Sequence, residues 1–468
     1  MDCRAQGGEA GAGRMMRTDL DSLASRLAAC VDDRLPQGIF RVHRAAFVDP
    51  QIFELEQRYI FERTWCFLGH ESQLHQPHDF ITTQIGSTPI LVSRDGEGRL
   101  GAFVNACRHK GALLCSREQG RARAHVCPYH GWVFDSAGKN TLLKYGASAG
   151  YSEAFLKDDH HLIPIAHLGN YRGFLFGSLN RDVPELAAFL GSAATLIDLI
   201  VDQSPHGVEL VPGRTLYTYE GNWKLQLDNG VDPYHLSEAH ASFLDVQARR
   251  RKGMGNVDSR SFDWSRRDGL PAGAINFDHG HSAVWLEQPE PDKRPIYPAI
   301  DEIRSRVGNT RADWMLKGRN VGIFPNMQIA DAISPMLRIF RPLAVNLTEM
   351  RAYCIAPVGE PTAQRAWRLR QYEDFFNPGG MATPDDAVLY EDCQRGLSAM
   401  PLDYLQGTSR GMGFQQSHAD EVVSTLGIQP VSSALGRYDT YSEVAFQGPY
   451  REWQRLLLAG VKGERPYE

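Results

Sequence analysis

The chain of 468 residues is long enough to bury a large core and to form two domains. A formal net charge of −6 gives no basic footprint for nucleic acid, and we expect no membrane span because the sequence has no apolar run of about 18 residues. The eight cysteines are widely spread, which is unlike a disulfide scaffold and favours a reducing cytoplasm.

The first part of the chain is predicted to be helical. Residues 1–16 are rich in Gly and Ala, have no apolar core of a signal peptide, and are expected to form a frayed arm. Residues 19–32 carry leucines at helical intervals, which predicts a short amphipathic helix. Residues 50–65 predict a second helix, because Pro50 suits a first helical position and an apolar face follows it.

Strand patterns replace the helical ones from Phe80 onward. Residues 90–92 and 100–106 flank an Asp-Gly pair and predict a hairpin. Residues 135–139 predict a turn, and residues 173–179 predict a further strand. We therefore expect a small all-β domain over residues 67–180.

Two short loops within this domain each offer one cysteine and one histidine, in Cys107-Arg108-His109 and in Cys127-Pro128-Tyr129-His130. A common zinc finger places paired cysteines first and paired histidines later. A mixed pair on each loop instead suits a two-iron cluster with two Cys on one iron and two His on the other, which is the Rieske pattern. A structural zinc site is the alternative. Cys115 lies outside this ligand set and is expected to be a buried free thiol.

The remainder of the chain mixes helices and strands, as an α+β domain does. Residues 258–278 are polar and rich in glycine, which predicts a mobile surface segment. No dinucleotide-binding fingerprint is found, so electrons are expected to arrive from another protein. The predicted helices cover residues 184–201 and 383–394, and the predicted strands cover 215–219, 337–340 and 350–355.

His235 and His240, with acids nearby, suggest a mononuclear iron site, because non-haem Fe(II) oxygenases use two His and one carboxylate. Five residues correspond to about 140° of rotation on a regular helix, so we expect a π-bulge or a helix end between the two His. The carboxylate should come from Asp385 or Asp386, at the start of the predicted helix over 383–394. Asp386 also suits a capping role there, and the spacing leaves both acids open.

With these motifs, the chain resembles the large (α) subunit of a Rieske non-haem iron aromatic-ring-hydroxylating dioxygenase, in the benzoate/toluate/anthranilate branch. The resemblance runs from Phe40 to about Asp439 and is carried by residues 107–111, 127–132, 221–240, 319–327 with 338–342, and 382–395. It implies a small all-β Rieske domain inserted into an α+β catalytic domain with a central antiparallel sheet of the helix-grip type. The expected division is residues 1–66 (N-terminal helices, part of the catalytic domain), 67–180 (Rieske [2Fe-2S] domain) and 181–468 (catalytic domain with mononuclear iron).

The resemblance also implies a role for each matched residue. Cys107, His109, Cys127 and His130 match the ligands of the [2Fe-2S] cluster, and His235, His240 and Asp386 match the ligands of the Fe(II), with Asp385 as second choice. Asp232 matches an acid that bridges an iron-binding His and a Rieske His of the neighbouring subunit, and Asn229 matches an Asn near the iron. The implied assembly is an α3 ring or an α3β3 complex with a small β subunit. A ferredoxin or ferredoxin reductase would supply electrons, with NAD(P)H as the ultimate donor.

The implied reaction is the dihydroxylation of an aromatic carboxylate, such as benzoate or anthranilate, by O₂ to a cis-dihydrodiol or catechol. The alternatives are a Rieske monooxygenase that hydroxylates or demethylates an aromatic acid such as salicylate, and an electron carrier with a degenerate second domain. Candidate pocket residues are Leu227, Val231, Leu236, Phe243 and Ile323 as apolar walls, His281, and Arg319 or Arg338 as partner of a carboxylate. Candidate residues for docking an acidic ferredoxin are Arg108, Lys110, Arg117, Arg121 and Arg123.

Overall fold

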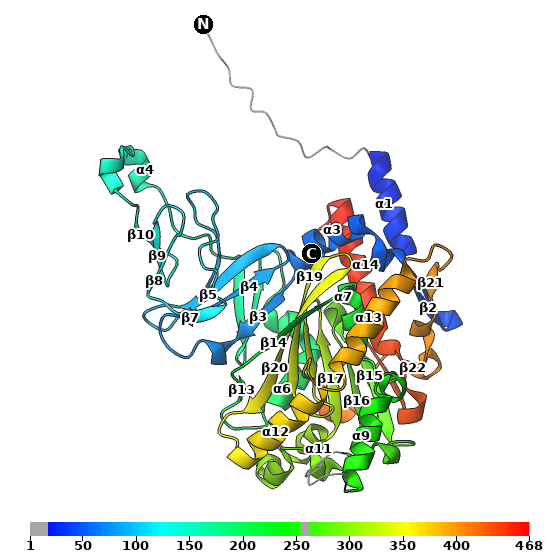
Figure 1. Cartoon of the computed structure of the whole chain (residues 1–468). Helices are drawn as coiled ribbons and strands as arrows, with labels where there is room; N and C mark the ends of the chain where they lie inside the picture. Colours follow the sequence, from blue (N-terminus) through cyan, green and yellow to red (C-terminus); the bar gives the residue numbers. More distant parts are fainter. Residues whose placement is uncertain (1–16, 254–261, 468) are drawn as a thin grey trace.

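The structure is a computed structural model that describes residues 17–253 and 262–467. The expected frayed arm at residues 1–16 and the first residues of the segment 258–278 lie outside these ranges. Figure 1 shows a β-rich lobe that projects from a larger body, and the body is built around one long sheet.

The N-terminal elements belong to the larger body (Figure 1). They are α1 (Arg17–Ala29), β1 (Val31–Arg34), β2 (Ile39–His43), α2 (Ala45–Val48) and α3 (Pro50–Glu56). Pro50 occupies the first turn of α3 as predicted, and the Asp49 side chain caps the helix by accepting from the Gln51 amide at 2.9 Å. The helix predicted over residues 50–65 is shorter, because α3 ends at Glu56 and passes into a π-helical turn over Gln57–Phe61.

The buried carboxylate of Glu56 joins three helices of the body. It forms an ion pair with Lys224 of α7 (Trp223–Asn229), and both side chains are fully buried. It also accepts hydrogen bonds at 2.7 Å from the indoles of Trp223 and of Trp453, which lies in α14 (Gln447–Lys462). A buried ion pair persists only where its remaining donors and acceptors are satisfied. These contacts therefore fix α3 and α14 against α7.

The β-rich part of the chain follows these helices. Its strands are β3 (Cys66–His70), β4 (Asp79–Ile85), β5 (Thr88–Arg94), β6 (Leu100–Val104), β7 (Gln119–Arg121), β8 (Ala124–Val126), β9 (Val133–Asp135), β10 (Asn140–Leu142), β11 (His167–Tyr171) and β12 (Phe174–Ser178). They form small antiparallel sheets of order β6-β5-β4-β7, β10-β9-β8 and β11-β12-β3. The predicted hairpin is β5–β6, with Arg94 opposite Leu100. The predicted turn at residues 135–139 joins β9 to β10.

The body is organised on an antiparallel sheet, which has ten strands within the described residues. Its strands are β13 (Val208–Leu210), β14 (Thr215–Tyr219), β15 (Pro271–Asn276), β16 (Ser282–Leu286), β17 (Gly318–Ile323), β18 (Met327–Ala330), β19 (Met336–Ala344), β20 (Leu347–Pro357), β22 (Gln415–Gln416) and β23 (Ser432–Arg437). The order is β13-β20-β19-β18-β17-β16-β15-β23-β22, with β14 also paired to β20. The two strands predicted over 337–340 and 350–355 are the neighbours β19 and β20.

Helices cover both faces of this sheet, and each face has its own apolar core. One face carries α7, α8 (Leu236–Ala239), α9 (Ala241–Arg251), α12 (Thr362–Phe375) and α13 (Thr383–Leu397). The other face carries α5 (Leu186–Leu190), α6 (Ala194–Val201), α10 (Ile300–Val307) and α11 (Asn309–Leu316). Among the described helices, none combines the length and the apolar character that crossing a bilayer requires.

The prediction of a mobile surface segment over residues 258–278 is wrong for residues 271–276. These residues form β15, a buried strand between β16 and β23. A side-chain carbon on Gly273 would lie 2.6 Å from the indole nitrogen of Trp285, so the glycine makes room for a tryptophan. Gly273 thus reflects close packing inside the sheet and not mobility.

Candidate metal centres and active site

The two loops with the Cys-x-His and Cys-x-x-His motifs fold in the same way. In each loop the cysteine amide donates at 2.8 Å to the carbonyl five residues later, that of Ala112 or Trp132. Each cysteine carbonyl accepts from a glycine amide, Gly111 at 2.9 Å and Gly131 at 3.0 Å. Both glycines have φ near +70°, which a residue with a side chain rarely adopts (73° and 72°). The glycines therefore allow two equivalent tight turns that present the Cys and His side chains.

The two loops place the predicted cluster ligands as two pairs, the cysteines in one apolar core and the two imidazoles side by side. Cys107 and Cys127 are buried, and the rings of His109 and His130 lie 4.4 Å apart. The Nδ1 atoms of both rings are buried without a hydrogen-bond partner among the described residues. Burial also raises the pKa of the Cys107 thiol, so a thiolate at this position needs the charge of a metal. Orphaned nitrogens and buried thiols fit a cluster held by two Cys and two His.

Apolar groups surround this donor set. Trp132 stacks on the ring of His109 with centroids 4.9 Å apart, and Phe134 is fully buried in the same apolar core. Cys115 is a buried free thiol, as predicted. The surroundings of a cluster control its solvent access and its potential.

The backbone between His235 and His240 is irregular, as their spacing predicts. The short helix α8 covers only Leu236–Ala239, and His240 leaves helical geometry with φ −109° and ψ 30° before α9 begins. A helix end therefore lies between the two His. The alternative of π-helical bonding is not found, since the His240 amide donates to the Leu236 carbonyl. The break brings the two rings to one side, with centroids 5.1 Å apart.

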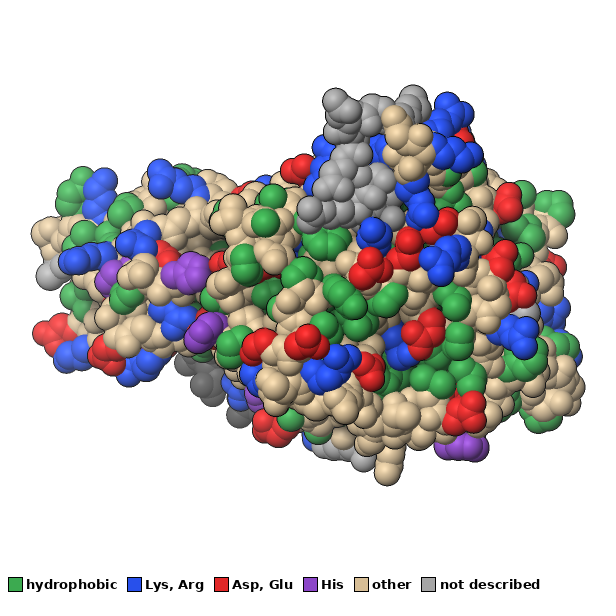
Figure 2. Space-filling model, turned by 90° about the horizontal axis from the view of Figure 1, so that it is seen from below, with side chains coloured by type: hydrophobic (Ala, Val, Ile, Leu, Met, Phe, Trp, Pro, Cys, Tyr) green, Lys and Arg blue, Asp and Glu red, His purple; other side chains and the backbone are tan. Residues whose placement is uncertain are grey.

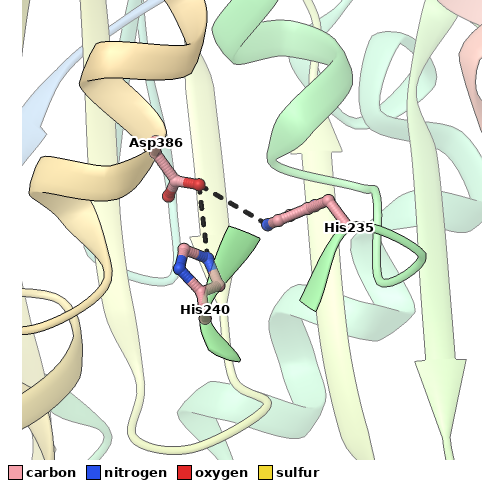
Figure 3. A group of neighbouring side chains, drawn as sticks. All are labelled: His235, His240 and Asp386. Atoms are coloured by element: carbon pink, nitrogen blue, oxygen red, sulfur yellow. Dashed lines mark ion pairs between the residues drawn. The ribbon is translucent and has the colours of Figure 1, made fainter. Parts of the chain in front are cut away.

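The carboxylate of Asp386 lies against the two imidazoles (Figure 3). Its Oδ1 lies 3.5 Å from Nε2 of His235 and 3.3 Å from Nε2 of His240, and the three donor atoms lie within 4.8 Å of one another. Ligand atoms about 2.1 Å from one ion and at right angles to each other are separated by about 3 Å. The three side chains therefore fit a metal ion bound on one face, which leaves its other positions open.

The start of α13 leaves the Asp386 carboxylate free to face the two imidazoles. Ala382 is the N-cap and provides no side-chain cap, so Asp386 does not act in a capping box. Burial raises the pKa of Asp386, but the hydrogen bond with His240 and the charges of His235 and Arg338 outweigh burial and hold this pKa below its usual range. The guanidinium of Arg338 lies 4.0 Å from the second oxygen of Asp386.

A further carboxylate stands behind each imidazole of the triad. Asp232 Oδ2 lies 3.2 Å from Nδ1 of His235, and Asp385 Oδ2 lies 3.4 Å from Nδ1 of His240. A carboxylate at Nδ1 fixes the tautomer that leaves Nε2 free for the metal and orients the ring. Asp385, the second choice of ligand from the sequence, thus contacts His240 from behind. Asn229 lies within 3.0 Å of Asp386 Oδ1 through its Nδ2.

We expect Asp385→Asn to weaken binding of iron at the triad roughly 10-fold, because the His240 ring loses the carboxylate that orients it. Anaerobic titration of the iron-depleted protein with ferrous ion measures this affinity. Asp392→Asn is the matched control, since Asp392 is an exposed acid of the same helix. An unchanged affinity in Asp385→Asn would show that His240 is positioned by other contacts.

An apolar pocket opens onto the triad. Its apolar lining consists of Pro233, Leu236, Trp264, Val284, Leu286, Ala330, Ala332, Ile333, Phe375, Phe376 and Tyr438. Besides the triad, its polar lining consists of Asn229, Asp232, Asn320 and Arg338. A pocket with apolar walls and a few convergent polar groups is typical of a site for a small organic molecule.

The structure separates the pocket residues predicted from the sequence into two groups. Leu236 and Arg338 line the pocket, whereas the other predicted apolar walls are buried in the cores: Leu227, Val231, Phe243 and Ile323. His281 is structural, since its Nε2 donates to the Phe189 carbonyl at 2.9 Å and its Nδ1 accepts from the Phe324 amide at 3.1 Å. Arg319 does not line the pocket and is paired with Asp331.

Sequence reasoning missed most of the pocket wall, including Trp264, Asn320 and Tyr438. These residues come from separate elements, and no local spacing connects them with the His pair. Glu443 also has an unusual environment, since burial and then the charge of Asp232 raise its pKa to about 7. The pocket residues can be recognised only in the folded structure, where separate elements bring them together around the pocket.

Two family models match the chain. The "Rieske [2Fe-2S] domain" model covers residues 64–148, and the "Ring hydroxylating alpha subunit (catalytic domain)" model covers residues 209–457, more than half of the chain. The two metal centres lie within these ranges, and the cofactors of the chain are accordingly a Rieske cluster and a mononuclear iron.

The similarity to named relatives covers both the Rieske range and the catalytic range of the chain. The chain is 41% identical to toluate 1,2-dioxygenase subunit alpha of Pseudomonas putida, over 93% of this chain and 95% of the relative. It is 38% identical to the anthranilate 1,2-dioxygenase large subunit of Acinetobacter baylyi, over 92% of each chain. A solved naphthalene 1,2-dioxygenase with bound indole has the same fold, with a TM-score of 0.76 and 23% identity over 90% of this chain and 95% of that one. Because family models, relatives and both donor sets agree, the chain belongs to the large (α) subunits of the Rieske-type aromatic-ring-hydroxylating dioxygenases.

Proposed function

We propose that this chain is a terminal oxygenase component that adds both atoms of O₂ to an aromatic carboxylate such as benzoate or anthranilate. The product is a cis-dihydrodiol, or a catechol where CO₂ is then lost. The observation that carries the proposal is an apolar pocket with few polar groups that opens directly onto His235, His240 and Asp386. The relatives named for toluate and anthranilate act on acids of this class.

The two metal centres assign roles to seven side chains. Cys107, His109, Cys127 and His130 would hold the [2Fe-2S] cluster, and His235, His240 and Asp386 would hold the ferrous ion. When bound, these groups supply the electrons and the activation of dioxygen. The protein contributes orientation of the ring, which lies between the apolar walls, and exclusion of water from the reacting carbons.

In this proposal Asp232 bridges the two metal centres, with its carboxylate between His235 and a Rieske His of the neighbouring subunit. Its Oδ2 is placed at Nδ1 of His235, and its Oδ1 accepts from the Tyr234 amide at 2.8 Å, so its orientation is fixed. The side chain of Asp232 is 18% exposed and Tyr234 is 52% exposed, which leaves the acid accessible to a Rieske His of a second subunit. Asn229 restrains the Asp386 carboxylate through its amide nitrogen.

The proposed assembly is an α3 ring or an α3β3 complex, in which the cluster of one subunit serves the iron of the next. The lobe projects away from the body (Figure 2), and the cluster loops expose Leu113, Val126 and Tyr129 at 47%, 60% and 66%. Exposed apolar side chains next to the cluster loops suit contact with another subunit.

An acidic ferredoxin or a ferredoxin reductase would deliver the electrons. The predicted docking residues are all exposed in this structure: Arg108, Lys110, Arg117, Arg121 and Arg123. Arg121 is also paired with Asp79 at 2.8 Å. The seven cysteines among the described residues are free, which supports a cytoplasmic location.

A substrate panel tests the proposal. We expect oxygen uptake coupled to product with at least one of benzoate, anthranilate, salicylate, a halobenzoate and an aromatic sulfonate, and no coupled uptake with a neutral hydrocarbon such as naphthalene. Labelled O₂ should place two labelled atoms in the product. One labelled atom would identify a monooxygenase instead, and coupled turnover of the hydrocarbon alone would refute an aromatic acid as substrate.

A further inference from the structure

The amide of Asn320 is held in one orientation on the floor of the pocket. Asn320 lies in β17, and its neighbours across the sheet, Val284 and Ala330, are also pocket-lining residues. Its Oδ1 accepts from the backbone amide of Asp331 at 3.3 Å. Its Nδ2 forms no hydrogen bond with any described residue. Because the oxygen is engaged, the amide nitrogen is the group left to a ligand, and it is a hydrogen-bond donor.

A buried group with a net positive charge lies directly beneath this asparagine. Arg294 and Arg319 both pair with the carboxylate of Asp331, and each of the three side chains is 1% exposed. Two guanidinium groups and one carboxylate leave a net charge of +1, and neither arginine pairs with another acid within the described residues. Charges in such a buried setting act strongly on their surroundings, since little water screens them.

The strand geometry places this charge behind the pocket floor. Side chains alternate along a strand, so Arg319 faces away from the side of the sheet that Asn320 occupies. Arg319 accordingly donates to the Trp314 carbonyl at 2.7 Å, in α11 on the opposite face. Asp331 in turn stands between Ala330 and Ala332, which both line the pocket. Two members of the positive group are therefore sequence neighbours of pocket-lining residues: Arg319 precedes Asn320, and Asp331 follows Ala330.

Arg338, the cation that lines the pocket, is engaged elsewhere. Its Nη2 lies 4.0 Å from Asp386 Oδ2, and its guanidinium packs 5.5 Å from the centre of the Phe376 ring. Arg338 pairs across the sheet with Gln328 and Ala352. Asn320 pairs with Ala330, which lies two residues further along the strand than Gln328. The charge of Arg338 is thus directed at the acid of the metal triad.

We propose that Asn320 is the specificity-determining residue for the acid group, donating its Nδ2 hydrogen bond to the substrate carboxylate while the Arg294–Asp331–Arg319 group beneath it supplies the attractive potential. This inference rests on the proposed function and specifies the end of the pocket where the acid is bound. A neutral ring substituent at the same point gains the hydrogen bond alone. A carboxylate gains both the hydrogen bond and the attraction to the buried charge.

The test compares benzoate with benzamide, which has the same shape and no charge. Dissociation constants are measured anaerobically by calorimetry on the iron-loaded holoenzyme, so that no turnover occurs. Asn320→Ala is expected to weaken benzoate binding roughly 10- to 100-fold, the range for a hydrogen bond to a charged group, and benzamide binding by less than about 10-fold. Asn320→Asp keeps the size of the side chain and an acceptor for the Asp331 amide, and it should eliminate benzoate binding while benzamide still binds.

Val284→Ala is the matched control, since Val284 lies beside Asn320 on the pocket floor and carries no polar group. It should change the affinities for benzoate and benzamide by the same factor. Iron content and the thermal midpoint show that each variant is folded, and the isosteric Asn320→Asp provides the comparison if Asn320→Ala loses stability.

The inference is overturned if wild type binds benzoate and Asn320→Ala changes its dissociation constant less than about threefold, or if Asn320→Asp still binds benzoate as tightly as wild type. It is also overturned if both ligands weaken equally in Asn320→Ala. A wild-type protein that turns over none of the aromatic acids would instead refute the proposed function, so the two failures are distinguishable.

Discussion

Asp386→Ala is expected to abolish oxygenation and to lower the iron content from about three to about two per chain. Asp386 is the acid whose Oδ1 faces both imidazoles of the triad, at 3.5 and 3.3 Å. Its removal takes away the anionic ligand and leaves the buried charge of Arg338 without its nearby carboxylate. The loss should exceed the roughly 10- to 100-fold typical of residues that only support a ligand.

Iron analysis and the Rieske spectrum of reduced protein measure the two centres separately in this variant. The cluster signal should remain at the wild-type level, because the four residues proposed to hold the cluster lie in the β-rich lobe, away from Asp386. Asp392→Ala, in the same helix and exposed, should keep about three irons and full activity. Retention of the third iron by Asp386→Ala, together with its loss in Asp385→Ala, would transfer the ligand role to Asp385.

Asp232→Asn is expected to keep both metal centres and to slow transfer of electrons from cluster to iron by roughly 100-fold. The substitution preserves the size of the side chain and an oxygen that can accept from the Tyr234 amide. It removes the negative charge that raises the pKa of His235, although burial alone would lower that pKa. An amide also cannot take up or release a proton at Nδ1 of His235 when the charge of the metals changes.

Single-turnover kinetics of cluster oxidation, recorded with substrate and O₂ present, measure this step directly. Asp245→Asn serves as the control, since it changes an exposed acid of α9. A normal rate in Asp232→Asn, with about three irons still bound, would rule out the bridging role of Asp232.

The candidate donor sets could be found in the sequence because their spacing is local. Cys107 and His109 lie within one turn, as do Cys127 and His130, and both turns are set by glycines that the sequence displays. The five-residue spacing of His235 and His240 likewise required a broken helix, and the end of α8 provides it.

The choice between Asp385 and Asp386 depended on a detail that spacing does not contain. In the structure the Thr383 hydroxyl donates to the Phe376 carbonyl at 2.8 Å, and Ala382 occupies the N-cap position of α13. This places Asp386 toward the His pair and Asp385 behind His240. The Thr383–Phe376 contact joins the start of α13 to the end of α12, and the spacing of the two acids does not reveal it.

The pocket could not be predicted because its walls come from strands whose order is set by the whole sheet. Leu227 and Val231 lie close to the His pair in sequence, yet they face the core. Asn320 becomes significant only through its pairing with Val284 and Ala330 across three strands. The Gly273–Trp285 contact illustrates the same limit, since a glycine that looks like a loop residue fills a packing role in β15.

Anomalous diffraction at the iron edge, from protein purified anaerobically with iron supplied, tests the central claim most directly. We expect two iron peaks between the sulfurs of Cys107 and Cys127 and the rings of His109 and His130, and a third peak among His235, His240 and Asp386. Absence of iron beside positions 235 and 240 under these conditions would contradict the assignment of this chain as an oxygenase.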